Sequence, residues 1–317
     1  MKKWIFAVIP MVLLVFTALV AQDDEGDFVK WFDFDVPAAV LRQAYKYDVK
    51  SQEKGDAPLD FVQLLAYSAA KNWGSFKSDS ECKHMEKVVE RVRNGERLHD
   101  ITQDMDLYNF YLVAYGAVLG GFVGDYEVDG KPAYGLKVFS PIAKGFNFTH
   151  SDDFGNPRNY GYSRPHLGHD MFGAVGTPII AVECGIVEAL GWNRYGGWRI
   201  GIRSLDNKRY YYYAHLQKNT PYAQGLAEGA LVQAGDVIGF LGNTGYSHTE
   251  NATNIKQPHL HFGMQIIFDE SQKNGNNQIW IDTYAITRFL NQNRMEVERV
   301  EDGQYRRKIQ TNSHPFS

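Results

Sequence analysis

The sequence predicts an α+β protein in which an N-terminal α-helical region precedes a mostly antiparallel β metallopeptidase-like domain. Between Val36 and about Gly124, apolar residues recur every three or four positions, as they do on one face of a helix. From His166 to Phe268 they form short runs of β-branched and aromatic residues separated by turns. Such closely spaced short strands are typical of an antiparallel sandwich or barrel.

The composition limits the classes of protein to consider. The 317 residues suffice for one large domain or two ordinary ones, and a 44% hydrophobic content allows a sizeable core. The net charge of −4 is mild, so we expect no nucleic-acid partner. Two cysteines, Cys82 and Cys184, do not make a disulfide scaffold. We expect Cys184 to be a small buried side chain, with a bridge to Cys82 as the alternative.

The first residues have the pattern of an export signal. Two lysines after Met1 precede an uncharged stretch of 18 residues, Trp4 to Ala21, and residues 22–35 form an acidic spacer. The apolar stretch is just long enough to span a bilayer. We therefore expect residues 1–21 to be a signal peptide or an N-terminal membrane anchor, with the body of the protein outside the cytoplasm.

Residues 36–124 are predicted to form an α-helical domain. One helix has an apolar stripe from Phe61 to Ala69 and starts near Asp60. A second includes Val88 to Leu98, and a third runs from Tyr108 to Val118. The carboxylates of this region have the spacing of a solvated helix face, so a second, glycosidase-like site is not expected.

The rest of the chain is predicted to be a connector over residues 125–160, a β-rich domain over 161–268 and a C-terminal extension over 269–317. Within these parts we expect strands at 177–182, 185–190, 198–203, 209–215, 237–241, 259–268 and 279–281, and a helix at 284–291.

His166 and Asp170 are spaced so that one metal ion can bind both. On a strand, residues 166, 168 and 170 would face one way, and Gly168 would leave space between the two ligands. His169 would point away, and we interpret it as a histidine that supports the site from behind. If the segment is a loop, this exclusion of His169 is weaker.

The pair His259 and His261 would project from one face of a strand about 6–7 Å apart, so that one can bind the metal and the other can contact water. His215 ends the run Tyr210–Tyr213, which alone we interpret as a mixed sheet face. Catalytic zinc sites use three protein ligands and leave a position for water.

His166, Asp170 and His261 supply two neutral imidazoles and one carboxylate, which leaves a net +1 on a single Zn²⁺ and favours acidification of water. His259 and His215 then remain as catalytic histidines. One would move a proton from the attacking water to the leaving amine, and the other would stabilise the developing oxyanion. The set predicts hydrolysis by zinc-activated water.

These motifs, in this order, resemble the lysostaphin-type (LytM-like) zinc endopeptidases, peptidase family M23. The similarity covers about residues 160–268 and rests on His166-x-Gly-x-Asp170, Gly176-Thr-Pro, Gly185-x-Val, Tyr213-Ala-His-Leu216, Gly229-x-x-Val-x-x-Gly235, Ile238-Gly, Gly242-x-Thr-Gly245 and His259-Leu-His-Phe262. It implies zinc binding by His166, Asp170 and His261, catalysis by His259 and His215, and a compact β fold with a groove over the zinc. It also implies cleavage of peptidoglycan stem peptides or cross-bridges.

One segment departs from the family pattern. Thirteen residues, Tyr246 to Pro258, separate the glycine motif from the histidine pair, which is more than family members usually have. This loop would form a groove wall or a lid, so it bears on the substrate and not on the metal.

Two other functions fit part of the pattern. The first is a non-catalytic envelope scaffold on the same fold, but such relatives commonly lose ligands, and here all the motifs are intact. The second is a biotinyl- or lipoyl-like carrier, suggested by the turn pattern Gly229 to Gly239, but no lysine stands at a hairpin tip there. Peptidoglycan peptide is therefore the expected partner, and the membrane is a partner only if residues 1–21 remain attached.

Overall fold

The computed structural model describes residues 32–54, 57–76, 80–159, 163–274, 277–300 and 303–313, apart from the side chains of residues 53, 54 and 80–82. The expected signal or anchor over residues 1–21 lies outside these ranges, as does most of the acidic spacer. Among the helices that are described, none has both the length and the apolar run needed to cross a membrane.

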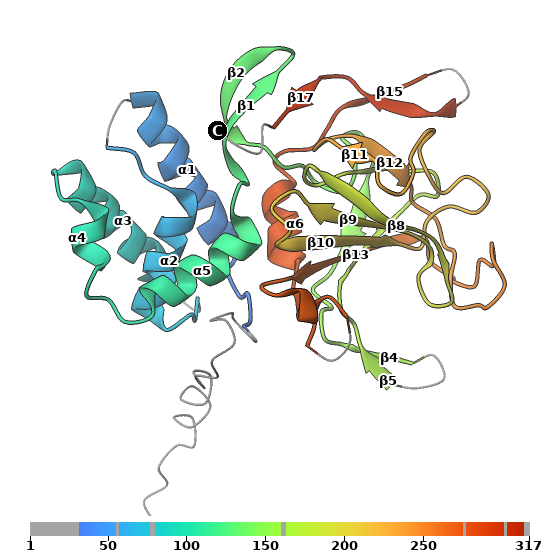
Figure 1. The fold of residues 1–317 in the computed structure, drawn as a ribbon, viewed down its shortest axis with the longest axis horizontal. Helices are drawn as coiled ribbons and strands as arrows, with labels where there is room; N and C mark the ends of the chain where they lie inside the picture. Colours follow the sequence, from blue (N-terminus) through green and yellow to red (C-terminus); the bar gives the residue numbers. More distant parts are fainter. Residues whose placement is uncertain are drawn as a thin grey trace, which may run out of the picture.

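Two parts lie side by side, a group of helices and a larger β-rich body (Figure 1). The helices are α1 (Ala38–Lys54), α2 (Phe61–Asn72), α3 (Ser80–Arg93), α4 (Leu98–Thr102) and α5 (Tyr108–Leu119). The β-rich body follows in the chain, and its sheets are antiparallel. The predicted α+β architecture is confirmed.

Local sequence explains where the helices begin and end. Asp60 precedes α2, and its carboxylate accepts a hydrogen bond from the backbone N–H of Gln63, which satisfies one of the free donors of the first turn. The prediction that Val88 and Leu98 share one helix is wrong. Gly95 has φ +96°, a left-handed conformation that ends α3, and Leu98 instead begins the short helix α4.

The β-rich body is built on one eight-stranded sheet in the order β11–β8–β9–β10–β13–β6–β3, with β14 also paired to β13. Its strands are β3 (Phe148–His150), β6 (His169–Gly173), β8 (Gly185–Asn193), β9 (Gly197–Ser204), β10 (Arg209–Ala214), β11 (Leu231–Val232), β13 (His259–Ile266) and β14 (Ile279–Ile281). The central strands match the predicted runs closely.

Smaller sheets surround this one. They are β7 (Pro178–Ile180) with β12 (Val237–Phe240), β4 (Pro157–Asn159) with β5 (Ser163–Pro165), β15 (Val297–Arg299) with β16 (Tyr305–Arg307), and β1 (Val123–Val128) between β2 (Lys131–Leu136) and β17 (Thr311–Asn312). The C-terminal extension therefore contributes strands to both the main sheet and the β1–β2 hairpin. It also supplies the short helix η1 (Glu270–Gln272) and α6 (Tyr284–Leu290).

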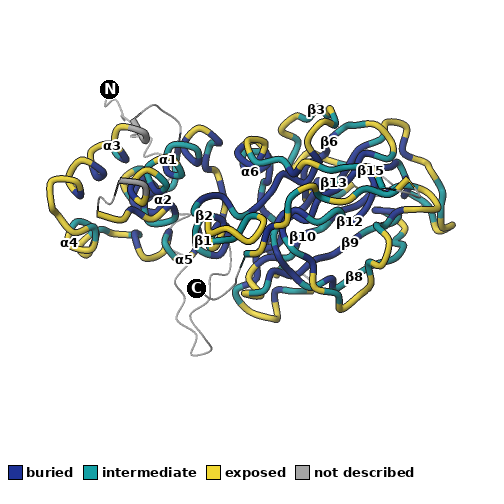
Figure 2. Tube along the Cα trace, turned by 90° about the horizontal axis from the view of Figure 1, so that it is seen from above, coloured by how far each residue is buried: buried dark blue, intermediate teal, exposed yellow. Residues whose placement is uncertain are grey.

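The helices and the sheet share one hydrophobic core, which appears in Figure 2 as buried chain running through the junction. Phe289 of α6 lies there, stacked on Phe61 of α2 with ring centroids 5.8 Å apart and in edge contact with Tyr45 of α1. Burial of such aromatic side chains fixes the helical part against the β-rich body.

Cys184 is a buried free thiol, in agreement with the first of the two expectations for this residue. Its sulfur contacts the side chain of Gln233 and the backbone N–H of Ala234. The side chain of Cys82 lies outside the described part of the chain.

Candidate metal centre

Two neighbouring strands bring the predicted metal ligands together. Asp170 in β6 and His261 in β13 stand directly opposite each other in the antiparallel pairing of these strands. His166 lies in the loop just before β6, because the strand begins only at His169. The loop still returns His166 to the same side, and the three side chains converge.

The three ligand atoms form a nearly equilateral triangle. His166 Nε2 lies 3.0 Å from Asp170 Oδ1 and 2.9 Å from His261 Nδ1, and the last two atoms are 3.1 Å apart. Ligands of a tetrahedral zinc at about 2.0–2.1 Å lie about 3.3 Å from one another. The set of two imidazoles and one carboxylate thus fits zinc in both chemistry and spacing.

Gly168 makes room for this convergence. A Cβ atom at this position would lie 2.5 Å from Cε1 and 2.6 Å from Nε2 of His261, which is closer than real contacts allow. Any larger residue would push the imidazole of His261 away from the other two ligands.

Asp153 orients His166 from behind. The Nδ1 atom of His166 lies 3.1 Å from the backbone carbonyl of Asp153, which can only accept, so Nδ1 holds the proton and Nε2 presents its lone pair to the metal. The Asp153 carboxylate is also within 3.2 Å of the same nitrogen. Burial opposes a charge on His166, but Asp153 and Asp170 raise its pKa to about 9. The site is therefore electrostatically suited to a cation.

Arg158 of β4 completes the set of contacts around the carboxylates. Its Nη2 donates to Asp153 Oδ2 at 2.6 Å and to Asp170 Oδ2 at 3.2 Å. Burial alone would raise the pKa of Asp170, but the adjacent imidazoles of His166 and His261 hold that pKa well below its usual range. Asp170 is ionised and fixed in place.

His215 and His259 lie together beside this triangle, with ring centroids 4.8 Å apart. Nδ1 of His215 lies 2.9 Å from the carbonyl oxygen of Thr244, and Nδ1 of His259 lies 2.8 Å from that of Gln257. Both rings therefore hold the proton on Nδ1 and leave Nε2 free to accept. Burial, aided by the charges of the neighbouring histidines, lowers the pKa of His215 well below its usual range.

His215 also has a strained backbone, with φ +62° in the left-handed region that non-glycine residues rarely adopt. Its N–H donates to the carbonyl of Gly196 at 2.7 Å, which holds this conformation. Strain of this kind costs about 1–3 kcal/mol and is typical of functional positions. The side chain of His215 is thereby directed at the metal triangle.

His169 lies behind the site. It is buried, and its Nε2 atom is 2.7 Å from Nδ1 of His150 in β3. Its Nδ1 atom is 3.7 Å from Asp153 Oδ1, so Asp153 lies between His169 and His166. The described residues that converge as metal ligands do not include His169.

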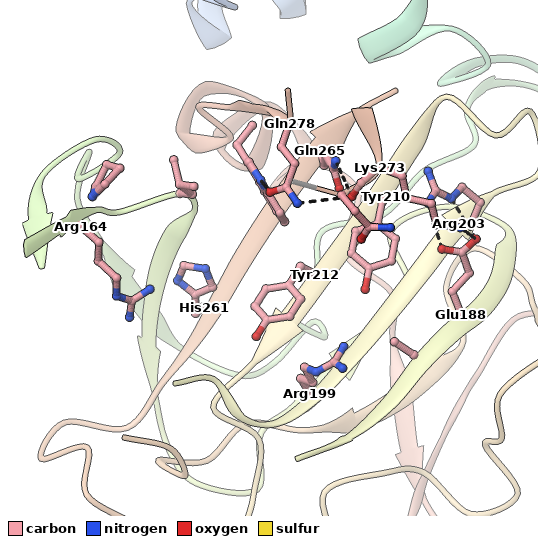
Figure 3. A pocket seen from close by; sticks show the side chains of 15 residues that line it. Arg164, Glu188, Arg199, Arg203, Tyr210, Tyr212, His261, Gln265, Lys273 and Gln278 are labelled. Carbon is pink, nitrogen blue, oxygen red and sulfur yellow. Dashed lines mark hydrogen bonds and ion pairs between the residues drawn. The ribbon is translucent and has the colours of Figure 1, made fainter. Parts of the chain in front are cut away.

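Two connected cavities open over these residues. A small pocket of about 50 Å³ covers the metal triangle and is bounded by His215 and Tyr246. A groove of about 780 Å³ lies beside it, over the sheet, and the two share Arg164, Tyr212 and His261 (Figure 3). A peptide lying along the groove would reach the metal pocket.

The loop from Tyr246 to Pro258 forms a wall of the small pocket through Tyr246. The ring of Tyr246 lies 5.9 Å from that of His215. Asn251 fastens the loop to the sheet, since its Oδ1 accepts from Trp198 Nε1 at 2.8 Å and from the N–H of Asn219 at 3.0 Å. The loop is thus a fixed wall and not a free lid in this structure.

The sequence did not predict which tyrosines of β10 line the groove. Tyr210 and Tyr212 line the groove, whereas Tyr211 and Tyr213 of the same strand are buried in the core. The two pairs differ only in the face of the strand to which their side chains point. The sequence alone does not say which of the two faces is exposed to the groove.

Comparison with known proteins agrees with the resemblance in the motifs. Residues 164–278 match the model of Peptidase family M23. The chain is 33% identical over 194 residues to an L-Ala–D-Glu endopeptidase of Bacillus subtilis, a match that covers 54% of this chain and 58% of that protein. It is 38% identical over 98 residues to lysostaphin of Staphylococcus staphylolyticus, with 31% of this chain and 18% of that protein covered.

The chain therefore spans just over half the length of the first of these relatives and less than a fifth of lysostaphin. A crystal structure of a lytM protein from Ruminococcus gnavus superposes with a TM-score of 0.56 at 22% identity, over 85% of this chain and 93% of that one. This likeness extends well beyond residues 164–278, so the arrangement of helices and sheet described above occurs elsewhere.

Proposed function

We propose that this chain, whose residues 164–278 match Peptidase family M23, is a zinc metalloendopeptidase of the lysostaphin (LytM-like) type that hydrolyses peptide bonds in peptidoglycan. The observation that supports this most directly is the convergence of His166, Asp170 and His261 to within 3.1 Å, with His215 and His259 beside them. A scaffold without activity would have no need of so complete a set.

His166, Asp170 and His261 would hold one Zn²⁺. When bound, zinc supplies a Lewis acid that lowers the pKa of water towards neutrality. The residues of the chain do the rest. His215 and His259 both direct Nδ1 at a backbone carbonyl, which leaves Nε2 as the acceptor, so one takes a proton from water and returns it to the leaving amine. The other imidazole would take up a proton from solvent at Nε2 and donate it in a hydrogen bond to the oxyanion that develops on the scissile carbonyl.

The relatives and the sequence of residues 1–21 support a proposal for the substrate and the place of action. The relatives include enzymes named for the bonds they cut, L-Ala–D-Glu in one and glycyl-glycine in another from Staphylococcus capitis. We therefore place the action of this chain on stem peptides or cross-bridges of the cell wall. The pattern of residues 1–21 favours export, with or without retention as a membrane anchor.

The roles are tested by three alanine variants of the full chain. His261→Ala should lose bound zinc, whereas His259→Ala and His215→Ala should keep zinc and lose about 10²- to 10⁴-fold in turnover. Zinc is measured by atomic emission, and cleavage by mass spectrometry of fragments released from purified peptidoglycan.

His248→Ala is the matched control, because His248 is an exposed histidine of the neighbouring loop. It should leave both zinc content and turnover unchanged. Equal zinc loss in all three site variants would refute the assigned roles. Absence of any chelator-sensitive cleavage by the unaltered chain would instead favour the non-catalytic scaffold.

A further inference from the structure

We propose that the groove beside the metal pocket selects peptides with a free carboxylate close to the scissile bond, and that Arg199 recognises this carboxylate. The inference rests on the proposed function and narrows its substrate class. It follows from the floor of the groove, its charge and the position of Arg199 relative to the metal centre.

The floor of the groove is the outer face of β9, β10 and β13. Tyr210 and Tyr212 lie along β10, and Tyr212 is paired with Gly201 on one side and with Gly263 on the other. A Cβ atom at Gly201 would lie 1.9 Å from Tyr210 Oη, and one at Gly263 would lie 2.9 Å from the ring of Trp280. The two glycines thus allow aromatic rings to lie on the sheet and form a smooth floor.

The groove is positively charged although the chain as a whole is negative. Its lining contains four cationic side chains, Arg164, Arg199, Arg203 and Lys273, and one carboxylate, Glu188. The charges of these five side chains add up to +3, whereas the whole chain has a net charge of −4. A cleft of one sign with low-dielectric walls concentrates ligands of the opposite sign.

Two of these cations share the one carboxylate of the lining. Arg203 forms a two-pronged pair with Glu188 at 3.0–3.1 Å, and Lys273 lies 3.1 Å from the same carboxylate. Figure 3 shows this group at one end of the groove, away from His261. These residues form the far wall, and both cations already have an ionic partner there.

Arg199 has no such partner. Among the described residues, no carboxylate lies within ion-pair distance of its guanidinium, and its Nε atom is buried without a hydrogen-bond acceptor. Arg164 is also without a carboxylate among them, but it stacks on Tyr195 at 4.9 Å from the ring centroid. The planar guanidinium of Arg199 can bind a carboxylate through two parallel hydrogen bonds, which neutral groups cannot match.

The strand pairing places Arg199 at the right distance from the chemistry. His261 is opposite Ala214 of β10, and Ile200, the neighbour of Arg199, is opposite Tyr213 on the other side of that strand. Arg199 and His261 therefore lie at nearly the same level, two strand spacings or about 10 Å apart. An extended peptide covers this distance in about three residues. The recognised carboxylate thus belongs to a residue within about three positions of the cleaved bond.

The experiment compares two soluble stem peptides that differ in one group, a glutamate near the scissile bond or the glutamine that replaces its carboxylate by an amide. The zinc-loaded full chain should cleave the acidic peptide with a kcat/KM about 10- to 100-fold higher. Arg199→Gln should abolish this preference by slowing only the acidic peptide. Arg199→Lys keeps the positive charge but loses the planar pair of N–H donors, so it should retain part of the preference.

The control is Arg306→Gln, which removes the same charge from an exposed arginine paired with Glu298 on the β15–β16 hairpin. It should keep the full preference. Thermal melting and zinc content of Arg199→Gln should match the unaltered chain, and if the variant fails to fold, Arg199→Lys decides. Equal cleavage of both peptides by the unaltered chain would overturn the inference and leave the proposed function standing.

A binding measurement distinguishes failure of the proposed function from failure of carboxylate recognition by Arg199. Each peptide is titrated into the His259→Ala variant, which is expected to bind but hardly cleave it, and the affinity is measured by calorimetry. If the unaltered chain cleaves neither peptide, yet the acidic one binds His259→Ala more tightly and loses this advantage in His259→Ala/Arg199→Gln, the proposed function fails and carboxylate recognition stands. Equal binding of the two peptides overturns the recognition by Arg199.

Discussion

Asp153 shows that the metal centre depends on residues that are not ligands. It contacts His166 through both its backbone carbonyl and its carboxylate, and it accepts a hydrogen bond from Arg158 at 2.6 Å. Burial opposes ionisation of Asp153, but hydrogen bonds with His166 and His169 hold its pKa well below its usual range. A fixed negative charge therefore sets the tautomer and orientation of a zinc ligand.

Asp153→Asn should lower zinc affinity about 10- to 100-fold, because the amide keeps the shape but loses the charge that orients His166. Affinity is measured by competition with a chromophoric chelator. Asp152→Asn is the matched control, since Asp152 is the exposed neighbour, and it should change affinity little. Unaltered affinity in Asp153→Asn would show that the backbone carbonyl alone orients the imidazole.

The ligand residues could be predicted from the sequence, but Asp153 and Arg158 could not. His166, Asp170 and His261 stand in short motifs whose spacing has a chemical meaning. Asp153 and Arg158 lie in a connector rich in polar residues and turns, where no periodicity says which side chain folds back onto the site. Their roles depend on the path of a loop, which only tertiary structure defines.

At the scale of elements, most strands could be predicted correctly from the sequence. One helix boundary, between α3 and α4, was predicted wrongly. The runs that became β8, β9, β10 and β13 are short, rich in β-branched and aromatic residues and separated by turns. The pairing order could not be predicted, since β13 lies between β10 and β6 although β11 and β12 precede it in the chain. This non-local order places His261 opposite Asp170.

The edge of the main sheet is held by an unusual pair of histidines. His150 of β3 and His169 of β6 share a hydrogen bond of 2.7 Å, and the ring of His150 also contacts Phe148 and Tyr284. Across this contact one nitrogen must donate and the other must accept. Burial, with the charges of His169 and Arg288, lowers the pKa of His150 to about 4.

This pKa predicts acid sensitivity of the sheet edge. Because the folded pKa of His150 lies below its ordinary value, neutral His150 contributes stability to the fold that is fully present above about pH 6.5. That stability is lost as the pH falls towards 4, since the unfolded chain then binds more protons. Hydrogen exchange at the β3 amides should accelerate over this window, and an NMR titration of His150 should give a pKa of about 4.

His150→Gln is the comparison for this prediction, because it removes the titrating group and keeps a side chain able to hydrogen-bond. In that variant the acceleration of β3 exchange between pH 6.5 and 4 should shrink. Exchange at β14, which pairs with the other end of β13 and not with β6 or β3, should show no such change in either protein. An NMR pKa of His150 near 6.5 would contradict this prediction.

At the scale of the whole molecule, one buried arginine ties the helices to the β-rich body. Arg209 of β10 is 1% exposed, and it donates to both oxygens of Glu183, to Asp206, and to the carbonyl of Ala117 at the end of α5 at 2.7 Å. The carbonyl groups of a last helical turn have no partner within the helix. Arg209 satisfies one of them from the sheet and so couples the two parts.

Arg209→Met should therefore destabilise the full chain by about 3–5 kcal/mol, because it leaves a partly buried carboxylate without its cation. The free energy of unfolding is measured by urea denaturation. The double variant Arg209→Met/Glu183→Gln should recover part of this loss, since it removes the unpaired charge as well.

The matched control is Arg306→Met, which breaks an ion pair whose side chains are 70% and 43% exposed and should cost less than about 1 kcal/mol. Hydrogen exchange then shows whether Arg209→Met loosens the attachment of the helices to the sheet or disturbs only β10. If Arg209 joins the two parts, amides of α5 as well as β10 should exchange faster in Arg209→Met. Acceleration confined to β10, with α5 unchanged, would mean that the shared aromatic core around Phe289 holds the helices without the arginine.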